Sequence, residues 1–502
     1  MTRWPFRFLL TLVTLLALTA SGAWAAEPLR IGSKRFTESY ILAEVLAETA
    51  RPHGPVEVKA GLGNTAIVYE ALRAGSIDLY PEYTGTIARE ILKSEEPLTL
   101  ADMRARLAPL GLGVDVPLGF NDGYALAVRA DTADRLGLHR LSDLARQPAL
   151  RLGLSNEFIG RADGWPGLAR RYGLPQRPQG LDHGLAYDAI AQGQVDVIDI
   201  YTTDAKIDHL GLRVLADDAS HFPRYDAVLL YRIDVPQRFP AAWAALKQLE
   251  GRIDEPAMIA MNARAELQGV AFGVIAREHL AGTAGAAGPA AGGGFWARLW
   301  GPDLARLAAQ HVGLVLISVA LAVALGVPVA LAVAPHAAAR TAVLGATGLL
   351  QTVPALALLA VLISLLGQIG TAPALVALTL YALLPIMRNT CTGLAEVPAG
   401  LKQAATALGL TAGQRLRSVE LPLALPVIVA GVRTATTIAV GTATIAAFIG
   451  AGGFGERIVT GLALNDRGLL LAGALPAAAL ALVCEAVFEA VERALARQRV
   501  PA

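Results

Sequence analysis

The polar chemistry of the second half of the chain is concentrated in residues 396–426, which lie between long apolar runs. This stretch carries five charged side chains, Glu396, Lys402, Arg415, Arg417 and Glu420. A polar, helix-prone loop between apolar runs favours a binding surface for something outside a membrane. No Ser/His/Asp set, metal cluster or cofactor loop stands out elsewhere, so the sequence predicts no catalytic residues and no bound metal.

Nucleotide hydrolysis is not expected of this chain. A phosphate loop needs the pattern G-x-x-x-x-G-K-[ST], and no Gly-Lys pair occurs anywhere in the sequence. Any ATP-driven step, together with its ATP and Mg²⁺, therefore requires a separate polypeptide, and we expect no cofactor on this one.

Length and composition point to more than one domain. The chain has 502 residues, 54 % of them hydrophobic, and a mean hydropathy of +0.47, which is high for a soluble protein. Its net charge of +1 gives no case for nucleic acid. Both cysteines, Cys391 and Cys484, lie in the apolar half, so no disulfide framework supports the first half.

The N-terminus is predicted to be a signal peptide over residues 1–26. Arg3 and Arg7 precede a short apolar run, and Ala23-Trp24-Ala25 fits a cleavage site. An uncleaved anchor of the same orientation is the alternative. Both predict that the following residues lie outside the cytoplasm, in the periplasm, with the protein held in a bacterial inner membrane.

Residues 27–280 alternate short strand-like and helical runs, which predicts an α/β fold. Residues 67–80 align with residues 185–198, and in both a helix ends at a glycine and a strand follows. This repeat predicts two lobes of similar build that clamp a ligand by hinge motion. Asp78 and Asp196, at equivalent places in it, are interpreted as strand-start or turn residues.

Five motifs in this half resemble the binding proteins of quaternary-amine-uptake ABC importers, which capture glycine betaine, choline, carnitine or related solutes. They are IGSKRFTES (31–39), GLGNT (61–65), YPEYTGT (80–86), GFNDGYALAV (119–128) and DIYTTD (199–204). The resemblance covers nearly all of residues 27–280 and implies a two-lobed periplasmic-binding-protein fold.

The resemblance also implies a binding site with a tyrosine box for a trimethylammonium group. By motif position, the box consists of Tyr83, Tyr124, Tyr201 and Tyr225, closed by the backbone of Asp122, and the carboxylate partners are Lys34, Thr86 and Arg161. A quaternary ammonium cannot donate a hydrogen bond, so aromatic faces, worth roughly 0.5–2 kcal/mol each, supply its strongest attraction. Tyr69, Tyr80 and Tyr187 are expected to be packing residues.

A flexible linker over residues 281–300 is expected to join this domain to the apolar half, because residues 281–294 are almost pure Ala and Gly. The second domain, residues 301–495, is predicted to be an all-α membrane domain. Its five apolar segments are 312–334, 342–366, 371–387, 427–449 and 468–484. Lys and Arg gather in the connections that five crossings place in the cytoplasm.

Two features inside these segments have specific expectations. Prolines such as Pro354 allow bends in a membrane helix. Arg433 is either a gating or pathway residue or, as favoured by its place near the cytoplasmic end, an arginine that snorkels to the interface.

Three motifs in the apolar half, 349–359, 380–390 and 448–458, resemble the permease subunits of the same importers. The loop at 393–422 resembles the EAA loop of such permeases, whose short helix docks into a cleft of the ATPase subunit. The implied coupling residues are Gln403, in place of the usual Glu, with Ala404, Ala405, Gly409, Leu421 and Pro422. Gly409 is expected to end the helix, and two copies of the chain are expected to complete the pore.

The sequence thus predicts a binding domain fused to a type I ABC importer permease for a quaternary-amine compatible solute. One alternative keeps this architecture but imports another trimethylammonium or amino-acid-like compound, such as ergothioneine. A second is a membrane-anchored receptor that only signals. The docking loop disfavours the receptor, because a sensor needs no ATPase-docking helix.

Overall fold

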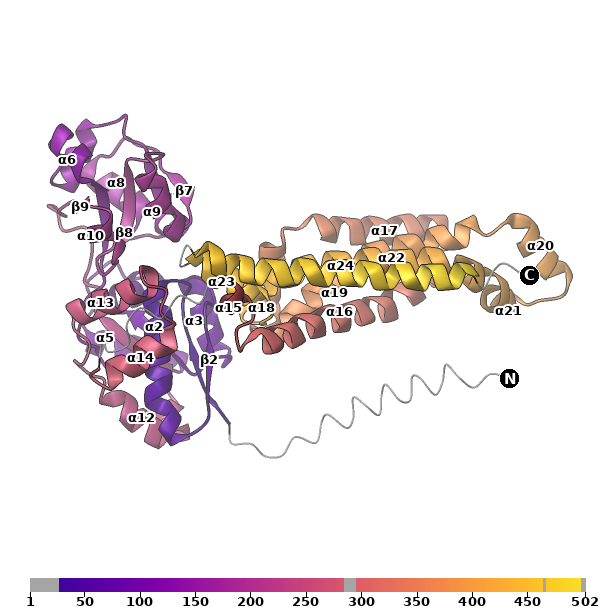
Figure 1. Ribbon diagram of the computed structural model, residues 1–502, viewed down its shortest axis with the longest axis horizontal. Helices are drawn as coiled ribbons and strands as arrows, with labels where there is room; N and C mark the ends of the chain where they lie inside the picture. Colours follow the sequence, from indigo (N-terminus) through magenta and orange to yellow (C-terminus); the bar gives the residue numbers. More distant parts are fainter. Residues whose placement is uncertain (1–26, 284–294, 464–465, 498–502) are drawn as a thin grey trace.

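The computed structural model describes residues 27–283, 295–463 and 466–497, which form an α/β domain followed by an elongated helical domain (Figure 1). The predicted signal peptide, 1–26, and the core of the predicted linker, 284–294, lie outside the described residues.

The first lobe of the α/β domain is built on a five-stranded sheet of order β2-β1-β3-β10-β4. Its strands are β1 (Leu29–Gly32), β2 (Val56–Lys59), β3 (Leu79–Tyr83), β4 (Leu112–Asp115) and β10 (Ala227–Arg232). Strands β2 and β3 pair parallel to β1, whereas β10 runs antiparallel between β3 and β4. The last strand therefore returns to the first lobe from the second.

The second lobe repeats this plan in the order β7-β6-β8-β5-β9. Its strands are β5 (Tyr124–Arg129), β6 (Leu152–Ser155), β7 (Gln179–Leu181), β8 (Val197–Tyr201) and β9 (Leu212–Val214). Strand β8 holds the central place that β3 holds in the first sheet. Each is preceded by one helix of the predicted repeat, α3 (Thr65–Arg73) or α9 (His183–Ala191), so the prediction of two similar lobes is confirmed.

The two aspartates of the repeat have the same structural role. The Asp78 carboxylate accepts a hydrogen bond from the backbone N–H of Arg30 at 2.8 Å, and the Asp196 carboxylate accepts one from that of Arg151 at 2.9 Å. Each carboxylate thus fixes the beginning of the neighbouring parallel strand. This confirms their interpretation as strand-start residues.

Helices cover both sheets. The main helices of the first lobe, besides α3, are α2 (Thr37–Ala50), α5 (Leu100–Leu107), α12 (Pro240–Lys247), α13 (Glu255–Glu266) and α14 (Phe272–Leu280). Those of the second lobe, besides α9, are α6 (Ala130–Leu136), α7 (Asn156–Gly160), α8 (Trp165–Tyr172) and α10 (Lys206–His209). Helices α12, α13 and α14 pack around α2, which makes α2 the buried centre of the first lobe.

Two chain segments connect the lobes and pair with each other as a hinge. Asn121 and Asp226 form an antiparallel bridge. Beside it, the backbone N–H of Asp122 donates to the Tyr225 carbonyl at 3.0 Å. Both segments carry residues of the predicted tyrosine box, so the box lies at the connection between the lobes.

The helical domain extends away from the α/β domain (Figure 1). Its long helices are α16 (Leu304–Val333), α17 (Ala337–Thr352), α18 (Ala355–Leu366), α19 (Thr371–Glu396), α22 (Leu421–Ala443) and α24 (Arg467–Arg497). Its short helices are α15 (Phe295–Leu299), α20 (Ala399–Ala407), α21 (Ala412–Arg415) and α23 (Gly455–Ala463). Among the described residues, four helical segments have the length and composition to cross a membrane, or five if α17 and α18 form one broken span.

The second predicted apolar segment is not one continuous helix. Helices α17 and α18 meet at an angle of 102°, and Val353 between them has extended backbone angles. The ring of Pro354 clashes with the backbone of the residue before it, which makes the helical conformation unfavourable for Val353. The predicted crossing over 342–366 is thus broken into two helices, and the expectation of a bend near Pro354 is confirmed.

Contacts between distant segments add to two further expectations. The guanidinium of Arg433 pairs with Glu485, at 2.5 Å from Nε, and with Glu492 at 3.1 Å, both on α24. The end of the predicted flexible linker forms helix α15, where Arg298 pairs with Asp466 at 2.5 Å. In both cases an ion-pair partner far along the sequence fixes the local structure.

Candidate functional site

Aromatic rings from both lobes meet at the hinge. Tyr124 and Tyr201 are opposite one another in the antiparallel pair of β5 and β8, and their ring centroids lie 5.1 Å apart. The Tyr124 ring also lies 5.7 Å from Tyr225 and 5.1 Å from Phe158. Cross-strand pairing thus brings Tyr124 and Tyr201 together, and Tyr225 joins them from the hinge segment.

Tyr83, the fourth box tyrosine, joins this group through Phe36. The Phe36 ring centroid lies 6.2 Å from that of Tyr83 and 5.1 Å from that of Tyr201. Phe36 immediately precedes α2. It belongs to the IGSKRFTES motif but was not predicted as a site residue, although an aromatic side chain two residues after Lys34 was the available signal.

The predicted carboxylate partners lie beside the tyrosines. The Nζ atom of Lys34 lies 5.1 Å from the Tyr83 ring centroid, and it pairs with the buried Glu82. The Arg161 guanidinium lies 5.1 Å from the Tyr124 ring centroid. The structure therefore brings both cations to the box, on different tyrosines.

Arg161 also connects the two lobes. Its Nη2 lies 2.7 Å from the Asp163 carboxylate and 3.4 Å from the Thr86 hydroxyl, and the Tyr225 hydroxyl donates to the same carboxylate at 2.7 Å. Burial raises the pKa of Asp163, but the ion pair with Arg161 outweighs it and lowers the pKa below its usual value. Two predicted partners, Thr86 and Arg161, are thus in contact across the cleft.

A chain of side-chain hydrogen bonds lies next to Tyr83. Its hydroxyl donates to Glu38 Oε1 at 2.6 Å. The Thr203 hydroxyl lies 2.5 Å from Glu38 Oε2 and 2.9 Å from Asp122 Oδ1. One hydroxyl has a single hydrogen, so the second carboxyl must supply the other, and Glu38 and Asp122 hold at least one proton between them.

The protonation of this pair agrees with its burial. Desolvation raises the pKa of Glu38 to about 7, against hydrogen bonds from Thr203 and Tyr83 that lower it. Desolvation and the charge of Glu38 together raise the pKa of Asp122 well above its usual value. Asp122 was predicted to act through its backbone, and its side chain has this additional role.

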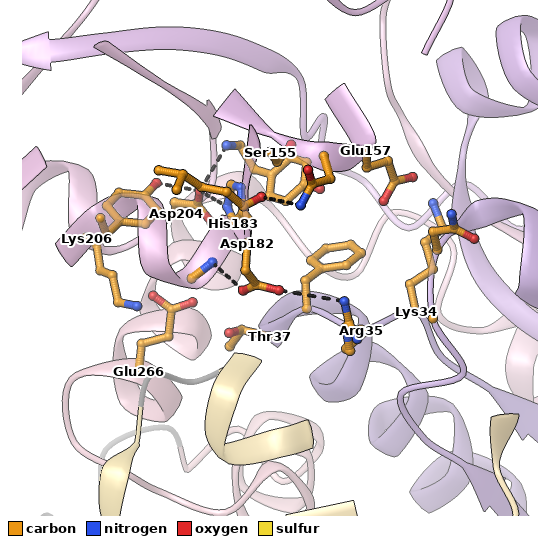
Figure 2. Close-up of a pocket in the computed structure, with 18 residues that line it drawn as sticks. Lys34, Arg35, Thr37, Ser155, Glu157, Asp182, His183, Asp204, Lys206 and Glu266 are labelled. Carbon is orange, nitrogen blue, oxygen red and sulfur yellow. Dashed lines mark hydrogen bonds and ion pairs between the residues drawn. The ribbon is translucent and has the colours of Figure 1, made fainter. Parts of the chain in front are cut away.

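A polar cavity of about 240 Å³ opens beside the box, between the lobes (Figure 2). Its lining includes Lys34, Arg35, Phe36, Tyr201, His183, Tyr187, Glu157, Lys206 and Glu266. Tyr187 is buried, as expected of a packing residue, and it also lines this cavity.

His183 is a site residue that the sequence did not reveal. Its ring centroid lies 4.4 Å from that of Tyr201, and its Nε2 lies 3.1 Å from Asp204. Burial lowers the pKa of His183, but the charges of Asp204 and Asp199 outweigh it and raise the pKa to about 9. The charges of these two aspartates thus favour the protonated ring. No motif pointed to it, because its partners come from other segments.

The α/β domain contacts the helical domain at the mouth of this cavity. Helix α23 packs on α9, which carries His183. The Arg35 guanidinium lies 4.9 Å from the Phe448 ring centroid and 3.6 Å from Asp182 across the cleft. The Ser76 hydroxyl accepts from the Ile369 backbone N–H at 3.2 Å. Both lobes therefore contact the helical domain, and Arg35 and Asp182 also connect the lobes to each other.

Phe448→Ala is expected to weaken this docking without changing ligand affinity. A single cation–aromatic contact at a partly exposed site is worth roughly 0.5–1 kcal/mol, so stimulation of the ATPase by ligand should fall about two- to fivefold. Ligand-stimulated ATP hydrolysis in nanodiscs checks this, with Trp296→Ala, an exposed aromatic, as the control. Full stimulation of Phe448→Ala would show that the contact is dispensable.

The predicted docking loop lies at the end of the helical domain remote from the α/β domain (Figure 1). Helix α20 contains Gln403, Ala404 and Ala405, and Gly409 follows it with a left-handed φ of +81°. Helix α22 begins at Leu421. The expectation that Gly409 ends the helix is confirmed.

A second short helix braces this loop. Arg415 of α21 donates to Glu420 at 2.6 Å and to the Thr406 hydroxyl of α20 at 3.2 Å. Gln403 and Ala404 are exposed, whereas Ala405 is buried. The loop thus presents a fixed surface on the side opposite the ligand cavity.

Comparison with known families agrees with a binding site in the α/β domain and a docking loop in the helical domain. Residues 27–282 match the substrate-binding domain of the ABC-type glycine betaine transport system. The chain belongs to this family. Residues 292–499 match the binding-protein-dependent transport system inner membrane component. One polypeptide therefore joins the substrate-binding and permease components of an ABC importer, and such a permease works with an ATPase partner.

Individual relatives resemble one half or the fusion. A glycine-betaine-binding protein of Pseudomonas aeruginosa is 35 % identical over 269 residues, 50 % of this chain and 86 % of that protein. The osmoprotectant import permease protein OsmW of Salmonella typhimurium is 45 % identical over 186 residues, 36 % of this chain and 86 % of that protein. The ergothioneine transport permease/ergothioneine binding protein EgtU of Helicobacter pylori is 32 % identical over 289 residues, 55 % of this chain and 51 % of that protein.

Proposed function

We propose that this chain captures a quaternary-ammonium compatible solute, such as glycine betaine, in the box formed by Tyr83, Tyr124, Tyr201 and Tyr225. The observation that carries the proposal is the convergence of these rings from both lobes at the hinge. Aromatic faces attract a cation that cannot form hydrogen bonds. Closure of the lobes then surrounds the head group.

The proposal extends to assembly and location. The binding domain faces the periplasm and the docking loop faces the cytoplasm, which is supported by their places at opposite ends of the molecule (Figure 1). Two copies of the chain form one pore, and a separate ATPase drives it through α20. The chain itself hydrolyses no ATP, which is supported by the lack of any Gly-Lys pair.

Calorimetric titration of the full chain in detergent tests the ligand class. Glycine betaine, carnitine, choline, ergothioneine and proline are the probes. Binding of a quaternary amine, with proline failing to bind, supports the proposal. Binding of ergothioneine alone supports the alternative, an importer of ergothioneine, which agrees with the similarity to EgtU. Binding of none of the five contradicts both functions.

Tyr201→Ala is expected to weaken glycine betaine binding about five- to thirtyfold, because the loss of one desolvated cation–aromatic contact costs roughly 1–2 kcal/mol. Tyr69→Ala is the matched control. Tyr69 is a half-buried tyrosine with Arg73 at 5.8 Å from its ring centroid, outside the box. Equal affinity of the Tyr201 variant and the wild type would remove Tyr201 from the site.

A further inference from the structure

The chain segment that follows α22 is in contact with the binding domain. The Phe448 ring lies against the guanidinium of Arg35, and the fully buried Leu62 of the first lobe packs against Gly450, where a Cβ atom would come within 2.7 Å of its side chain. Residues 450–453, here called the glycine loop, include three glycines with φ between +73° and +85°. Glycine has little conformational preference of its own, so other contacts must fix the shape of this loop.

One face of the first turns of α16 supplies such contacts. Gln310 Oε1 accepts a hydrogen bond from the Gly453 backbone N–H at 3.1 Å. Arg306 donates to the same oxygen at 3.1 Å and pairs with Glu456 of α23 at 2.8 Å. Residues 306 and 310 are about one helical turn apart, so their side chains share a face of the helix. This face holds the glycine loop and the beginning of α23, the helix that packs on α9 of the second lobe.

His311, the next residue of α16, connects this helix to the end of α22. Its ring is fully buried, and its Nε2 lies 3.1 Å from the Val440 carbonyl oxygen. Because a carbonyl oxygen only accepts hydrogen bonds, Nε2 is the donor. A continuing α-helix would pair this carbonyl with the N–H of Thr444, but that N–H donates to the Gly441 carbonyl, since the chain continues as the 3₁₀ helix Thr444–Ile449. His311 thus provides the partner that the end of α22 lacks.

Helix α22 extends from this point to the docking loop. It begins at Leu421, within the docking loop at 393–422, and its last residue is Ala443. Its 23 residues span about 35 Å, and it packs along α16 and α19. Packed side chains and rigid secondary elements carry coupling between distant sites. The element that His311 contacts at one end is therefore the element that adjoins the ATPase-docking loop at the other.

We propose that Gln310 and His311 couple docking of the loaded binding domain to the ATPase-docking loop, because they fix the glycine loop and the end of α22 to α16. This inference rests on the proposed function, in which a bound solute closes the lobes and α20 contacts the ATPase. Without these two hydrogen bonds, the glycine loop yields to the binding domain while α22 keeps its place. Both are positioning residues, since neither lies in the ligand cavity or in the docking loop.

The test measures ATP hydrolysis by the full chain with its ATPase in nanodiscs, and the readout is the ratio of the rates with and without glycine betaine. His311→Met fills a similar space but has no hydrogen for the Val440 carbonyl. Its ratio should fall about two- to tenfold, the equivalent of one hydrogen bond, while calorimetry gives the wild-type affinity for glycine betaine. His311→Gln keeps a side-chain N–H donor and should restore most of the ratio.

Gln310 is tested in the same way, independently of His311. Gln310→Met loses the acceptor for the Gly453 N–H and should lower the ratio, whereas Gln310→Glu keeps an acceptor and should preserve it. Ser318→Ala is the matched control. Ser318 is a buried residue of α16 whose hydroxyl donates to the Val315 carbonyl of the same helix at 3.0 Å. This variant loses a hydrogen bond within α16 and should keep the wild-type ratio.

The outcomes separate the inference from the proposed function. A wild-type ratio in both His311→Met and Gln310→Met would overturn the inference, whatever the absolute rates, because damage to the fold alone lowers both rates together. An equal fall in Ser318→Ala, or no recovery in either His311→Gln or Gln310→Glu, would overturn it as well. A wild type that glycine betaine does not stimulate would instead overturn the proposed function, and the inference with it.

Discussion

Leu408→Asp is expected to abolish transport while the binding domain still takes up its ligand. Leu408 is 80 % exposed at the end of α20, on the loop opposite the ligand cavity. Leu401 of the same helix is exposed as well. Exposed apolar surface that extends over more than one side chain is typical of an interaction site, and the family supplies an ATPase as its partner. A central apolar contact in an interface is worth roughly 2 kcal/mol or more, so ATPase binding should fall at least about thirtyfold.

Co-purification of the ATPase and uptake into proteoliposomes measure the effect of Leu408→Asp. Leu110→Asp, on an exposed leucine of the binding domain, introduces the same charge away from the loop and should transport normally. Wild-type uptake by the Leu408 variant would show that α20 is not the docking helix. Loss of ligand binding in the same variant would show that the substitution damages the fold instead.

The stability of the binding domain is expected to fall as the pH rises through 7. Burial raises the pKa of Glu38 from 4.5 to about 7 in the folded state, so folding favours the protonated carboxyl. The stability that this gives is complete below pH 4.5 and is lost as the pH rises through 7. It amounts to about 3 kcal/mol. Above that pH, the Glu38 carboxylate is ionised in a buried site, where it lacks the solvation that it has in the unfolded chain.

Thermal unfolding of the full chain between pH 5 and 9 checks this. Glu38→Gln keeps an acceptor for Tyr83 and offers Thr203 a permanent donor, so its stability should be nearly constant over the range where the wild type declines. Glu70→Gln, at an exposed carboxylate that pairs with Arg73, should follow the wild type. Parallel pH profiles of the Glu38 variant and the wild type would rule out the shared proton.

The parts of the fold that follow from local sequence could be predicted. The repeat at 67–80 and 185–198 correctly indicated two similar lobes, because a helix ending at a glycine before a strand is a local pattern. The tyrosines were named from family motifs, and the pairing of β5 with β8 explains why Tyr124 and Tyr201, far apart in sequence, meet.

The rest depends on contacts that no local pattern contains. Glu38 and Thr203 are 165 positions apart, so although each lies in one of the five family motifs, no local pattern shows that the two side chains meet. His183 gains its charge from Asp204 and Asp199, which lie on or just after β8. Arg433 shows the same limit in the helical domain. Its place near the cytoplasmic end suggested snorkelling, whereas the two carboxylates that pair with it lie 52 and 59 positions away.

The fusion of the binding domain to the permease fixes their ratio at synthesis. In the proposed homodimer, each pore therefore has two binding domains, and the fusion supplies none in excess of the permease. Uptake at low solute concentration is then limited by how fast the solute reaches two stationary sites. A binding domain that has taken up solute, however, does not have to diffuse to the pore, because the covalent connection keeps its effective concentration there high. The architecture therefore favours prompt delivery over scavenging capacity.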